Sequence, residues 1–450
     1  MSEIVAFIDE GLGNSSYLVE LGEGRAMVVD PTRDATPYLA AAAQRGLSIS
    51  HAVETHLHAD FLTGSRELAA RGATVLASRA AGIEWPHRGF DDGDELDLGG
   101  LRLQAIATPG HTPEHLSWLL CDGDRPVSLF SGGALLVDAV ARTDLIAPEE
   151  TEPLARASWR SLHERILSLP DDVAVYPTHG AGSFCAAPTN GERTTTIGRE
   201  RAANPLVVAA DEDTFVARLL TSYGTYPPYF HRLRERNRRG PDILGTPFPP
   251  LRVLDTDDLR RHLEEGAVAV DARPVTSWAA GHIRGALSIP LRPQFGSWLG
   301  WLVAENRPLV FVVDRRQDTA ELVRQAVTVG YERLVGATTG GADAWRKAGL
   351  PIATTELLAA RSLDRPVIDV RQSNEHALGH LPAAAHVELG EIARQAGAMP
   401  TGPLAVMCAH GERAATAASL LEQAGRTDVS VVIGGPEDWV AGGGKLATAS

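Results

Sequence analysis

Short apolar runs alternate with turn residues over roughly the first 175 positions of the chain. Clear examples are residues 26–30, 51–55, 101–107 and 127–131. Runs of roughly four to eight such residues between turns predict strands, and helical stretches lie between several of them. The pattern therefore predicts an α/β domain with many strands in this part of the chain.

The composition changes between residues 211 and 250. Aromatic residues from Tyr223 to Phe230 lead into an arginine-rich run that ends at Arg239, and prolines cluster at 247–250. The proline cluster predicts a linker. We expect the aromatic and basic run to form part of a dimer interface, a lid over an anionic thiol substrate, or solvated surface.

The C-terminal part of the chain contains an internal repeat. An apolar run followed by Asp-x-Arg and Gly-His occurs at residues 268–283 and again at 367–381. Each copy continues with a second apolar run, at 309–313 and 404–407, and each ends in Gly-Gly-x-x-x-Trp. That last motif comprises Gly340, Gly341 and Trp345 in the first copy and Gly434, Gly435 and Trp439 in the second. A period of about 100 residues is the size of a domain, so the repeat predicts two similar α/β domains in tandem.

Length and composition fit this organisation. At about 100–200 residues per domain, the 450 residues predict several domains, and 44% hydrophobic with 22% charged residues is typical of globular proteins. The net charge of -15 would repel a phosphate backbone, so nucleic acid is not expected as a partner. No apolar run reaches the ~18 residues of a membrane span and the first residues lack signal-peptide features. We therefore expect a cytoplasmic protein without a membrane partner.

Histidines gather at predicted strand ends in the N-terminal domain. The segment Thr-His-Leu-His-Ala-Asp-Phe at 55–61 follows a predicted strand, and alternate residues of an extended loop project to one side. His56 and His58 would therefore converge on one ion, and His111 and His179 also follow predicted strands. Such a set can bind a transition metal with an open coordination position. The alternative is a group of histidines hydrogen-bonded at loop entrances.

Cys408 begins a second candidate site. It follows an apolar run and opens the segment Cys-Ala-His-Gly-Glu-Arg, after which residues 414–424 favour a helix. Loop N–H groups and a helix N-terminus favour an anion, so they would stabilise a thiolate or a persulfide at this cysteine. The alternative is a cysteine buried at a strand end, where free cysteines often lie.

Residues from about 3 to 245 resemble the metallo-β-lactamase fold and, within that superfamily, the persulfide dioxygenases. The similarity rests on Gly-Asn-Ser-Ser-Tyr at 13–17, His-Leu-His-Ala-Asp at 56–60, Thr-Gly at 63–64 and Arg-Thr-Asp at 142–144. The resemblance implies an αββα sandwich over residues 1–245. It also implies a mononuclear ferrous site, held by two histidines and one aspartate, that binds persulfide and oxygen and releases sulfite.

Two positions depart from the ligand pattern of the superfamily. Phe61 stands where the superfamily has a histidine, and Gly133 stands where it has an acidic ligand. A dinuclear hydrolase site of the glyoxalase II type is therefore not expected, because both residues that would hold the second ion are missing. Changing Gly133 to Asp is expected to raise the affinity for iron if the ancestral geometry of the site persists.

The remaining donors still suit a single ion. We expect His56, His58 and His111 to hold one Fe²⁺, or alternatively Zn²⁺ in a tetrahedral site. Asp60 and His179 are expected to orient these ligands from behind rather than to bind the metal.

Residues from about 355 to 450 resemble a rhodanese domain. The similarity rests on Asp-Val-Arg at 369–371, Glu375, Gly-His-Leu at 379–381 and the six-residue loop opened by Cys408. The resemblance implies that Cys408 is the nucleophile, which carries sulfane sulfur as a persulfide and passes it to a thiol, sulfite or cyanide. Arg413 would hold the loop or attract an anionic substrate. The backbone amides that would cradle the persulfide belong to Ala409, His410, Gly411 and Glu412.

The preceding segment, residues 252–350, resembles the same fold but has Asp314 at the place of the cysteine. A carboxylate cannot form a persulfide. We therefore expect this copy to be catalytically silent and to serve as a spacer, a docking surface or a dimerisation module.

The other two cysteines differ in their settings. Three cysteines at irregular spacing predict neither a disulfide framework nor a CxxC zinc site. Cys121 is expected to fill the core at a strand end. Cys185, in a glycine-rich loop after His179, resembles a cysteine that takes part in sulfur handling in fused dioxygenase-rhodanese proteins, so a catalytic role is expected for it.

The resemblances together cover almost the whole chain and imply a persulfide dioxygenase-rhodanese fusion that acts in sulfide detoxification. Its substrates would be persulfides of glutathione, coenzyme A or another low-molecular-weight thiol, and its products sulfite and thiosulfate. One alternative is a sulfurtransferase whose metallo-β-lactamase domain is only a scaffold, and another is a zinc-dependent thioester hydrolase. A homo-oligomer is expected.

Overall fold

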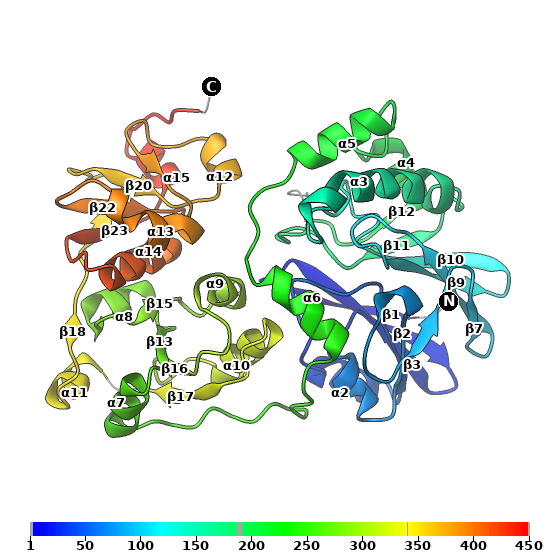
Figure 1. Cartoon of the computed structure of the whole chain (residues 1–450), viewed down its shortest axis with the longest axis horizontal. Helices are drawn as coiled ribbons and strands as arrows, with labels where there is room; N and C mark the ends of the chain where they lie inside the picture. The colour runs from blue at the N-terminus through cyan, green and yellow to red at the C-terminus, as the bar shows by residue number, and fades with distance from the viewer. Residues whose placement is uncertain (1–2, 187–190, 340, 449–450) are drawn as a thin grey trace. The chain divides into compact units, whose positions relative to one another are not determined.

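The structure is a computed structural model that describes residues 3–186, 191–339 and 341–448 (Figure 1). Gly340, in the first of the two Gly-Gly-x-x-x-Trp motifs, lies outside the described residues. In the described part of the chain, every helix is too short or too polar to cross a lipid bilayer.

The chain folds into two compact units, one made mostly of residues before the proline cluster and one made mostly of residues after it. Their bounds are Met1–Pro249 with Val327–Gly330, and Pro250–Ala326 with Tyr331–Ser450. The finer division into domains at 1–245, 252–350 and 355–450 stays a prediction.

Two six-stranded sheets form the first unit, with the orders β1-β2-β3-β4-β5-β6 and β12-β11-β10-β9-β8-β7. Strands β3 to β6 are parallel to one another, whereas β7 to β10 are antiparallel. The bounds of the first sheet are β1 Ile4–Asp9, β2 Asn14–Gly22, β3 Arg25–Val29, β4 Ser48–Val53, β5 Thr74–Ser78 and β6 Arg88–Phe90. Those of the second are β7 Glu95–Asp97, β8 Leu101–Ala107, β9 Leu116–Asp122, β10 Arg125–Gly132, β11 Ala174–Pro177 and β12 Thr195–Thr196.

Helices cover the outer faces of both sheets. Between the sheets lies a core to which Tyr17 and Met27 contribute from one side and Trp118 and Phe130 from the other. Apolar side chains of α1 and α2 pack on the outer face of the first sheet, and those of α3, α4 and α5 on the second. The helices are α1 Thr36–Gln44, α2 Ser65–Ala69, α3 Thr151–Arg160, α4 Ile197–Ala203, α5 Glu212–Thr221 and α6 Phe230–Arg239. This layering confirms the predicted αββα sandwich.

The arginine-rich run becomes helix α6, which positions the predicted histidine loop. Phe230 and Leu233 are buried on one face of α6. On the same helix the amide of Asn237 donates hydrogen bonds to the backbone carbonyls of His58 and Phe61, each at 2.8 Å. A single buried side chain therefore fixes the backbone of the loop that carries the first histidines.

Two parallel sheets dominate the second unit, which confirms the two predicted α/β copies, and β14 His282–Ile283 pairs with β18 Ile352–Ala353 in a small antiparallel sheet. The orders of the two parallel sheets are β15-β13-β16-β17 and β19-β23-β22-β20-β21. The bounds are β13 Val268–Asp271, β15 Leu287–Ser288, β16 Leu309–Val312 and β17 Leu334–Thr338, then β19 Leu357–Ala359, β20 Val367–Asp369, β21 Ala385–His386, β22 Leu404–Met407 and β23 Val429–Ile433. The helices include α7 Thr256–Glu264, α8 Val275–Ala280, α9 Phe295–Leu302, α10 Thr319–Thr328, α11 Ala342–Lys347, α12 Ser373–Ala377, α13 Ile392–Gln395, α14 Glu412–Gln423 and α15 Pro436–Ala441.

The repeated Asp-x-Arg and Gly-His motifs make the same buried contact in both copies. In the second copy the guanidinium of Arg371 binds the carboxylate of Asp369 at 2.7 Å and donates to the carbonyl of Gly379 at 2.8 Å. Arg273 makes the corresponding contacts in the first copy, at 2.6 and 2.9 Å. The motif therefore ties the strand that ends in its aspartate, β13 or β20, to the loop beyond the next helix.

Candidate functional site

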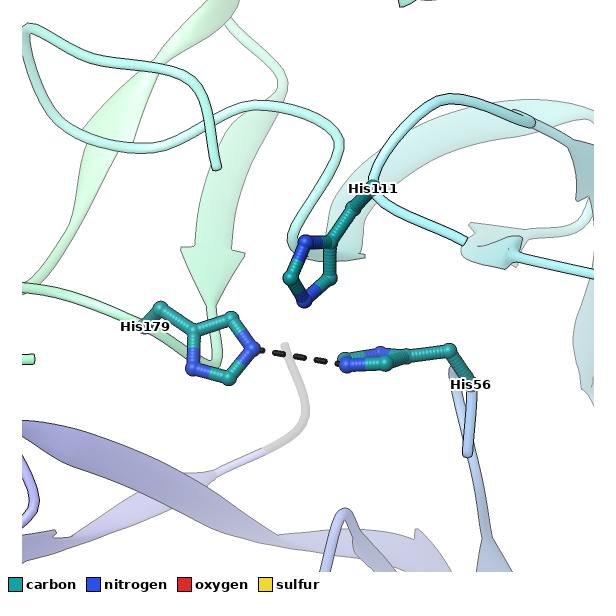
Figure 2. Close-up of side chains that lie close together, drawn as sticks. All are labelled: His56, His111 and His179. Carbon is teal, nitrogen blue, oxygen red and sulfur yellow. Dashed lines mark hydrogen bonds between the residues drawn. The ribbon is translucent and has the colours of Figure 1, made fainter. Parts of the chain in front are cut away.

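Three buried histidines converge at strand ends of the first unit. His56 follows β4, His111 follows β8 and His179 follows β11. One ring nitrogen from each lies within 4.8 Å of the others, and Figure 2 shows the three rings facing a common space. The Nε2 atoms of His56 and His179 are 3.4 Å apart.

Each of these rings has a partner behind it at Nδ1. The Nδ1–H of His111 donates to the carbonyl of Arg142 at 2.6 Å, and that of His179 donates to the amide oxygen of Asn14 at 3.0 Å. Nδ1 of His56 lies 2.9 Å from the hydroxyl of Thr55, which donates its own proton to Asp30 and so accepts from the ring. With Nδ1 protonated in each ring, Nε2 of a neutral imidazole carries the free lone pair.

The arrangement fits a transition-metal ion. Burial lowers the pKa of His56 and of His111 well below the ordinary histidine value, so both rings are neutral donors. A tetrahedral ion bound at about 2.0–2.1 Å by two nitrogens holds them about 3.4 Å apart, which matches the His56–His179 separation. Imidazole nitrogens suit both Zn²⁺ and Fe²⁺.

His58, a predicted ligand, belongs to two other groups whose ligand atoms lie within 4.8 Å of one another, one with Asp60 and His179 and one with Asp30 and Glu54. Its Nε2 is 3.2 Å from Asp30 and 3.5 Å from Glu54, and its ring stacks on Phe61 with centroids 4.2 Å apart. Burial opposes a charge on this ring, but the two carboxylates outweigh it and raise the pKa of His58. Burial also raises the pKa of Glu54 to about 7. The structure therefore brings His179 to His56 and His111, and it places His58 against the buried carboxylates of Asp30 and Glu54.

Asp60 is buried beside His179. Its Oδ2 accepts a 2.7 Å hydrogen bond from the amide of Asn14 and is 3.4 Å from Nδ1 of His179. Burial opposes the carboxylate, yet His179 holds the pKa of Asp60 far below its usual range. The carboxylate of Asp60 binds the amide of Asn14, and Asn14 in turn accepts the hydrogen bond that orients His179. Its role, like that of His58, stays a prediction.

Gly133 leaves no room for the acidic ligand that the superfamily has there. A Cβ on this residue would lie 2.5 Å from a ring carbon of His111 and 3.1 Å from the side chain of Ala141. The N–H of Gly133 instead donates to Nε2 of His115 at 3.0 Å. The geometry on which the expected effect of Gly133→Asp depends is therefore not present here, because the added side chain would overlap the ring of His111.

Sequence analysis missed His115. This ring is buried and stacks on His56 with centroids 5.1 Å apart, and its Nδ1 is 2.9 Å from the hydroxyl of Thr108. Burial lowers the pKa of His115 to about 3, so it is a neutral acceptor for Gly133. The available signal was its place at the start of a strand that pairs with the one preceding His111.

Cys185 is fully buried next to this site. Its N–H donates to the hydroxyl of Ser183 at 3.1 Å, and its carbonyl accepts the N–H of Arg142 at 2.8 Å. Burial, and then the charge of Asp60, raise the pKa of Cys185 well above the ordinary value. In this state the side chain is a thiol rather than a nucleophilic thiolate. Cys121 lies in the core, as predicted.

Cys408 ends β22 and starts the loop that leads into α14. Gly411 has φ of 113°, which only glycine adopts without strain, and its N–H donates to Sγ of Cys408 at 3.0 Å. A Cβ on Gly435 would lie 2.4 Å from the carbonyl of Ala409, so the Gly-Gly motif allows the chain to approach the loop closely.

The other predicted loop residues are distributed around this cysteine. The guanidinium of Arg413 binds the carboxylate of Glu375 through two hydrogen bonds of 2.5 and 2.8 Å, a contact that holds the loop. Ala409 and His410 line a cavity of about 350 Å³, and Glu412 is the first residue of α14. In the first copy, Asp314 accepts a 3.2 Å hydrogen bond from the hydroxyl of Ser277.

Comparisons with known proteins agree with this division. A model of the metallo-beta-lactamase superfamily matches residues 9–179, and a model of the rhodanese-like domain matches 255–348 and 354–442. The chain is 34% identical to human mitochondrial persulfide dioxygenase ETHE1 over 202 residues, which is 44% of this chain and 73% of that protein. It is 36% identical to hydroxyacylglutathione hydrolase of Methylococcus capsulatus over 37% of this chain and 62% of that enzyme.

A solved metallo-beta-lactamase structure from Staphylococcus aureus is similar over a larger share of the chain. Its TM-score is 0.65 at 28% identity, and the match covers 75% of this chain and 98% of that one. Since the first unit is little more than half of the chain, the match extends into the second unit.

Proposed function

Because the chain belongs to the metallo-β-lactamase superfamily, is related to persulfide dioxygenase ETHE1 and carries a rhodanese-like region, we propose that it is a sulfur-metabolism enzyme with two coupled activities. The first unit would oxidise a low-molecular-weight persulfide to sulfite. The second would transfer sulfane sulfur through Cys408. The observation that carries this proposal is the N–H of Gly411, aimed at Sγ of Cys408 in front of α14.

Sulfur transfer requires a cysteine that is stable both as a thiolate and as a persulfide. Sγ of Cys408 would attack the terminal sulfur of a persulfide, and the electron pair of the broken S–S bond would leave on the donor thiol. The Gly411 N–H and the start of α14 favour negative charge at this position in both states. The Arg413–Glu375 pair keeps the loop in this form.

Persulfide oxidation would occur at the facing histidines. A bound ferrous ion would supply the chemistry that joins a persulfide and oxygen, which balances as RSSH + O₂ + H₂O → RSH + SO₃²⁻ + 2 H⁺. The protein would hold it with His56, His111 and His179, whose Nδ1 partners keep all three Nε2 atoms available. Neutral donors leave the full charge of the ion in place, which favours an anionic persulfide.

The partners in this proposal are persulfides of glutathione, coenzyme A or a related thiol, with sulfite and thiosulfate as products. Assembly as a homo-oligomer is part of the same proposal.

Two observations favour narrower functions. The missing carboxylate at Gly133 favours a sulfurtransferase with a non-catalytic first unit. Three imidazoles suit zinc and thus a thioester hydrolase, although the second-ion residues are absent.

Iron loading and oxygen uptake test the first activity. Protein loaded anaerobically with Fe²⁺ should retain about one ion per chain and consume oxygen with glutathione persulfide or coenzyme A persulfide. No iron and no uptake would leave the scaffold alternative. Zinc retention with cleavage of S-D-lactoylglutathione would instead indicate a hydrolase.

The variant Cys408→Ser tests the second activity. It should abolish transfer of sulfur from thiosulfate to cyanide and leave the initial rate of oxygen uptake unchanged, because the two centres use different residues. Cys121→Ala is the matched control, since Cys121 is a buried core residue. Retained transfer in Cys408→Ser would refute the assignment of the nucleophile.

A further inference from the structure

The first rhodanese-like copy, which lacks a cysteine, packs against the helix that follows Cys408 (Figure 1). The N–H of Ser288 in β15 donates to the hydroxyl of Ser419 in the middle of α14 at 3.0 Å. The N–H of Gly285 donates to the carboxylate of Glu422 near the end of α14 at 2.8 Å. Residues 414–421 of α14 are all buried. The silent copy therefore packs rigidly against α14, next to the loop that begins at Cys408.

Arg292 follows β15 in the silent copy, and its guanidinium lies near the start of α14. Its carbonyl accepts hydrogen bonds from Gln325 at 3.0 Å and from the N–H of Phe295 at 2.9 Å, so its backbone is fixed independently of its side chain. Nη1 of Arg292 lies 3.9 Å from a carboxylate oxygen of Glu412, the first residue of α14.

The charge of Arg292 is only loosely neutralised. Among the described residues, the 3.9 Å contact with Glu412 is its one ion pair, and its guanidinium donates no hydrogen bond. Arg413, by contrast, is fully engaged with Glu375. The Arg292 side chain is 28% exposed, so a small solute can reach it.

The guanidinium of Arg292 interacts electrostatically with charged groups of the loop that begins at Cys408. Burial lowers the pKa of Arg292, and the nearby charge of Arg413 acts in the same direction. Glu412 and Cys408 act in the opposite direction, which means that a negative charge on the cysteine and the charge of Arg292 favour each other. A guanidinium that has lost much of its hydration in this way gains from a further anion.

We propose that Arg292 of the silent copy completes the Cys408 site by binding the small anion, sulfite or thiosulfate, that exchanges sulfur with the cysteine. This inference rests on the proposed sulfurtransferase function. It assigns the silent copy a role in substrate binding, in addition to supporting α14.

The transfer step explains why a loosely paired cation is useful there. The sulfur of sulfite attacks the terminal sulfur of the Cys408 persulfide and forms the new S–S bond of thiosulfate. The old S–S bond breaks, and its electron pair stays on Sγ of Cys408 as the thiolate. Balanced, the step is Cys–S–S⁻ + SO₃²⁻ → Cys–S⁻ + S₂O₃²⁻. Three negative charges meet in it, so a loosely paired guanidinium lowers their repulsion.

Alkylation of Cys408 tests the anion-binding claim without relying on transfer activity. The rates with anionic iodoacetate and with neutral iodoacetamide are measured by mass spectrometry of the Cys408 peptide. Arg292→Gln should lower the iodoacetate rate roughly fivefold to tenfold and leave the iodoacetamide rate within about twofold. Arg292→Lys keeps the charge and should keep the ratio of the two rates. Arg316→Gln, at an exposed arginine of the same copy, should change neither rate.

A second variant keeps the test decisive if Arg292→Gln fails to fold. Glu412→Gln removes the counter-charge of Arg292 and should raise the iodoacetate rate relative to iodoacetamide. An unchanged ratio in a folded Arg292→Gln protein, or in Glu412→Gln, overturns the inference.

Steady-state kinetics separate this inference from the proposed function. Arg292→Gln should raise the KM for thiosulfate and sulfite roughly tenfold while the rate with dithiothreitol as a neutral acceptor stays unchanged. If wild-type protein shows no transfer at all while the alkylation ratio responds to Arg292, the proposed function fails and the anion site stands. If wild-type transfer is normal and Arg292→Gln leaves KM unaltered, only this inference fails.

Discussion

At the residue scale, the facing histidines owe their orientation to the groups behind them. His179 is held by Asn14 and Asp60, and His58 is held by Asp30 and Glu54. The two rings are therefore expected to respond differently to the same substitution. His179→Gln should lower metal affinity by more than about 100-fold while the first unit stays folded, because it removes a donor.

His58→Gln is the matched comparison. It leaves the buried Asp30 and Glu54 without their cationic partner and should reduce the free energy of unfolding by about 3–5 kcal/mol. Metal content by elemental analysis and chemical denaturation distinguish the two effects. If His58→Gln were stable and metal-free while His179→Gln retained metal, the ligand assignment would return to His58.

Gly133 gives a second prediction at this scale. Gly133→Asp should lower the free energy of unfolding by about 1–3 kcal/mol and reduce iron content, because the added Cβ overlaps the ring of His111. Gly133→Ala carries the same Cβ without the carboxylate and should show a similar loss. Higher iron content in Gly133→Asp than in wild type would mean that His111 yields and a carboxylate ligand is regained.

The limits of sequence analysis are also clearest for single residues. His56 and His111 were predicted to share an ion because both follow strands, and the structure brings them together. The choice between His58 and His179 depends on Asp30 and Asn14, which are distant in sequence, so spacing alone could not make it. His115 was missed for a similar reason, because its significance comes from the backbone of Gly133.

At the element scale, strand positions were predictable because apolar runs set them. The run 101–107 coincides with β8, the run 404–407 coincides with β22, and α14 covers most of the predicted helix. The pattern could not predict that α6 holds the histidine loop. Most of its residues are polar, chiefly arginines, and only a few apolar residues and one asparagine pack inward.

A histidine cluster in helix α12 and the segment after it should make the stability of the protein depend on pH. His376 stacks against His380 and His386 with centroids 3.9 and 4.1 Å apart. Burial, and then the charges of these two neighbours, lower the pKa of His376 in the folded state. Protonation therefore favours the unfolded chain, so this residue contributes stability above about pH 6.5 that is lost as the pH falls below it.

The variant His376→Gln should reduce that acid sensitivity. Denaturation curves of the second unit at pH 7.5 and pH 5.5 should show a smaller loss of unfolding free energy in the variant than in wild type, because glutamine binds no proton in this range. An equal loss in both proteins would assign the sensitivity to other groups.

At the scale of the whole molecule, each unit carries one candidate site, and the length and the repeat had already predicted several domains. The resemblance could assign each domain a fold, because its motifs are local and occur in order. It could not assign the silent copy a function, since Asp314 shows only what that copy lacks. The contacts of β15 and Arg292 with α14 depend on how two domains pack, which no local motif encodes.

Coupling of the two proposed centres has a direct readout in the stoichiometry of the products. Iron-loaded full-length protein is given glutathione persulfide in air-saturated buffer, and oxygen uptake, sulfite and thiosulfate are measured in one sample. Coupled centres should consume one O₂ per two persulfides, with thiosulfate as the product, whereas Cys408→Ser should consume one O₂ per persulfide and release free sulfite. Iron-loaded wild-type protein that consumes no oxygen, or that yields the same sulfite as Cys408→Ser, would contradict this coupling.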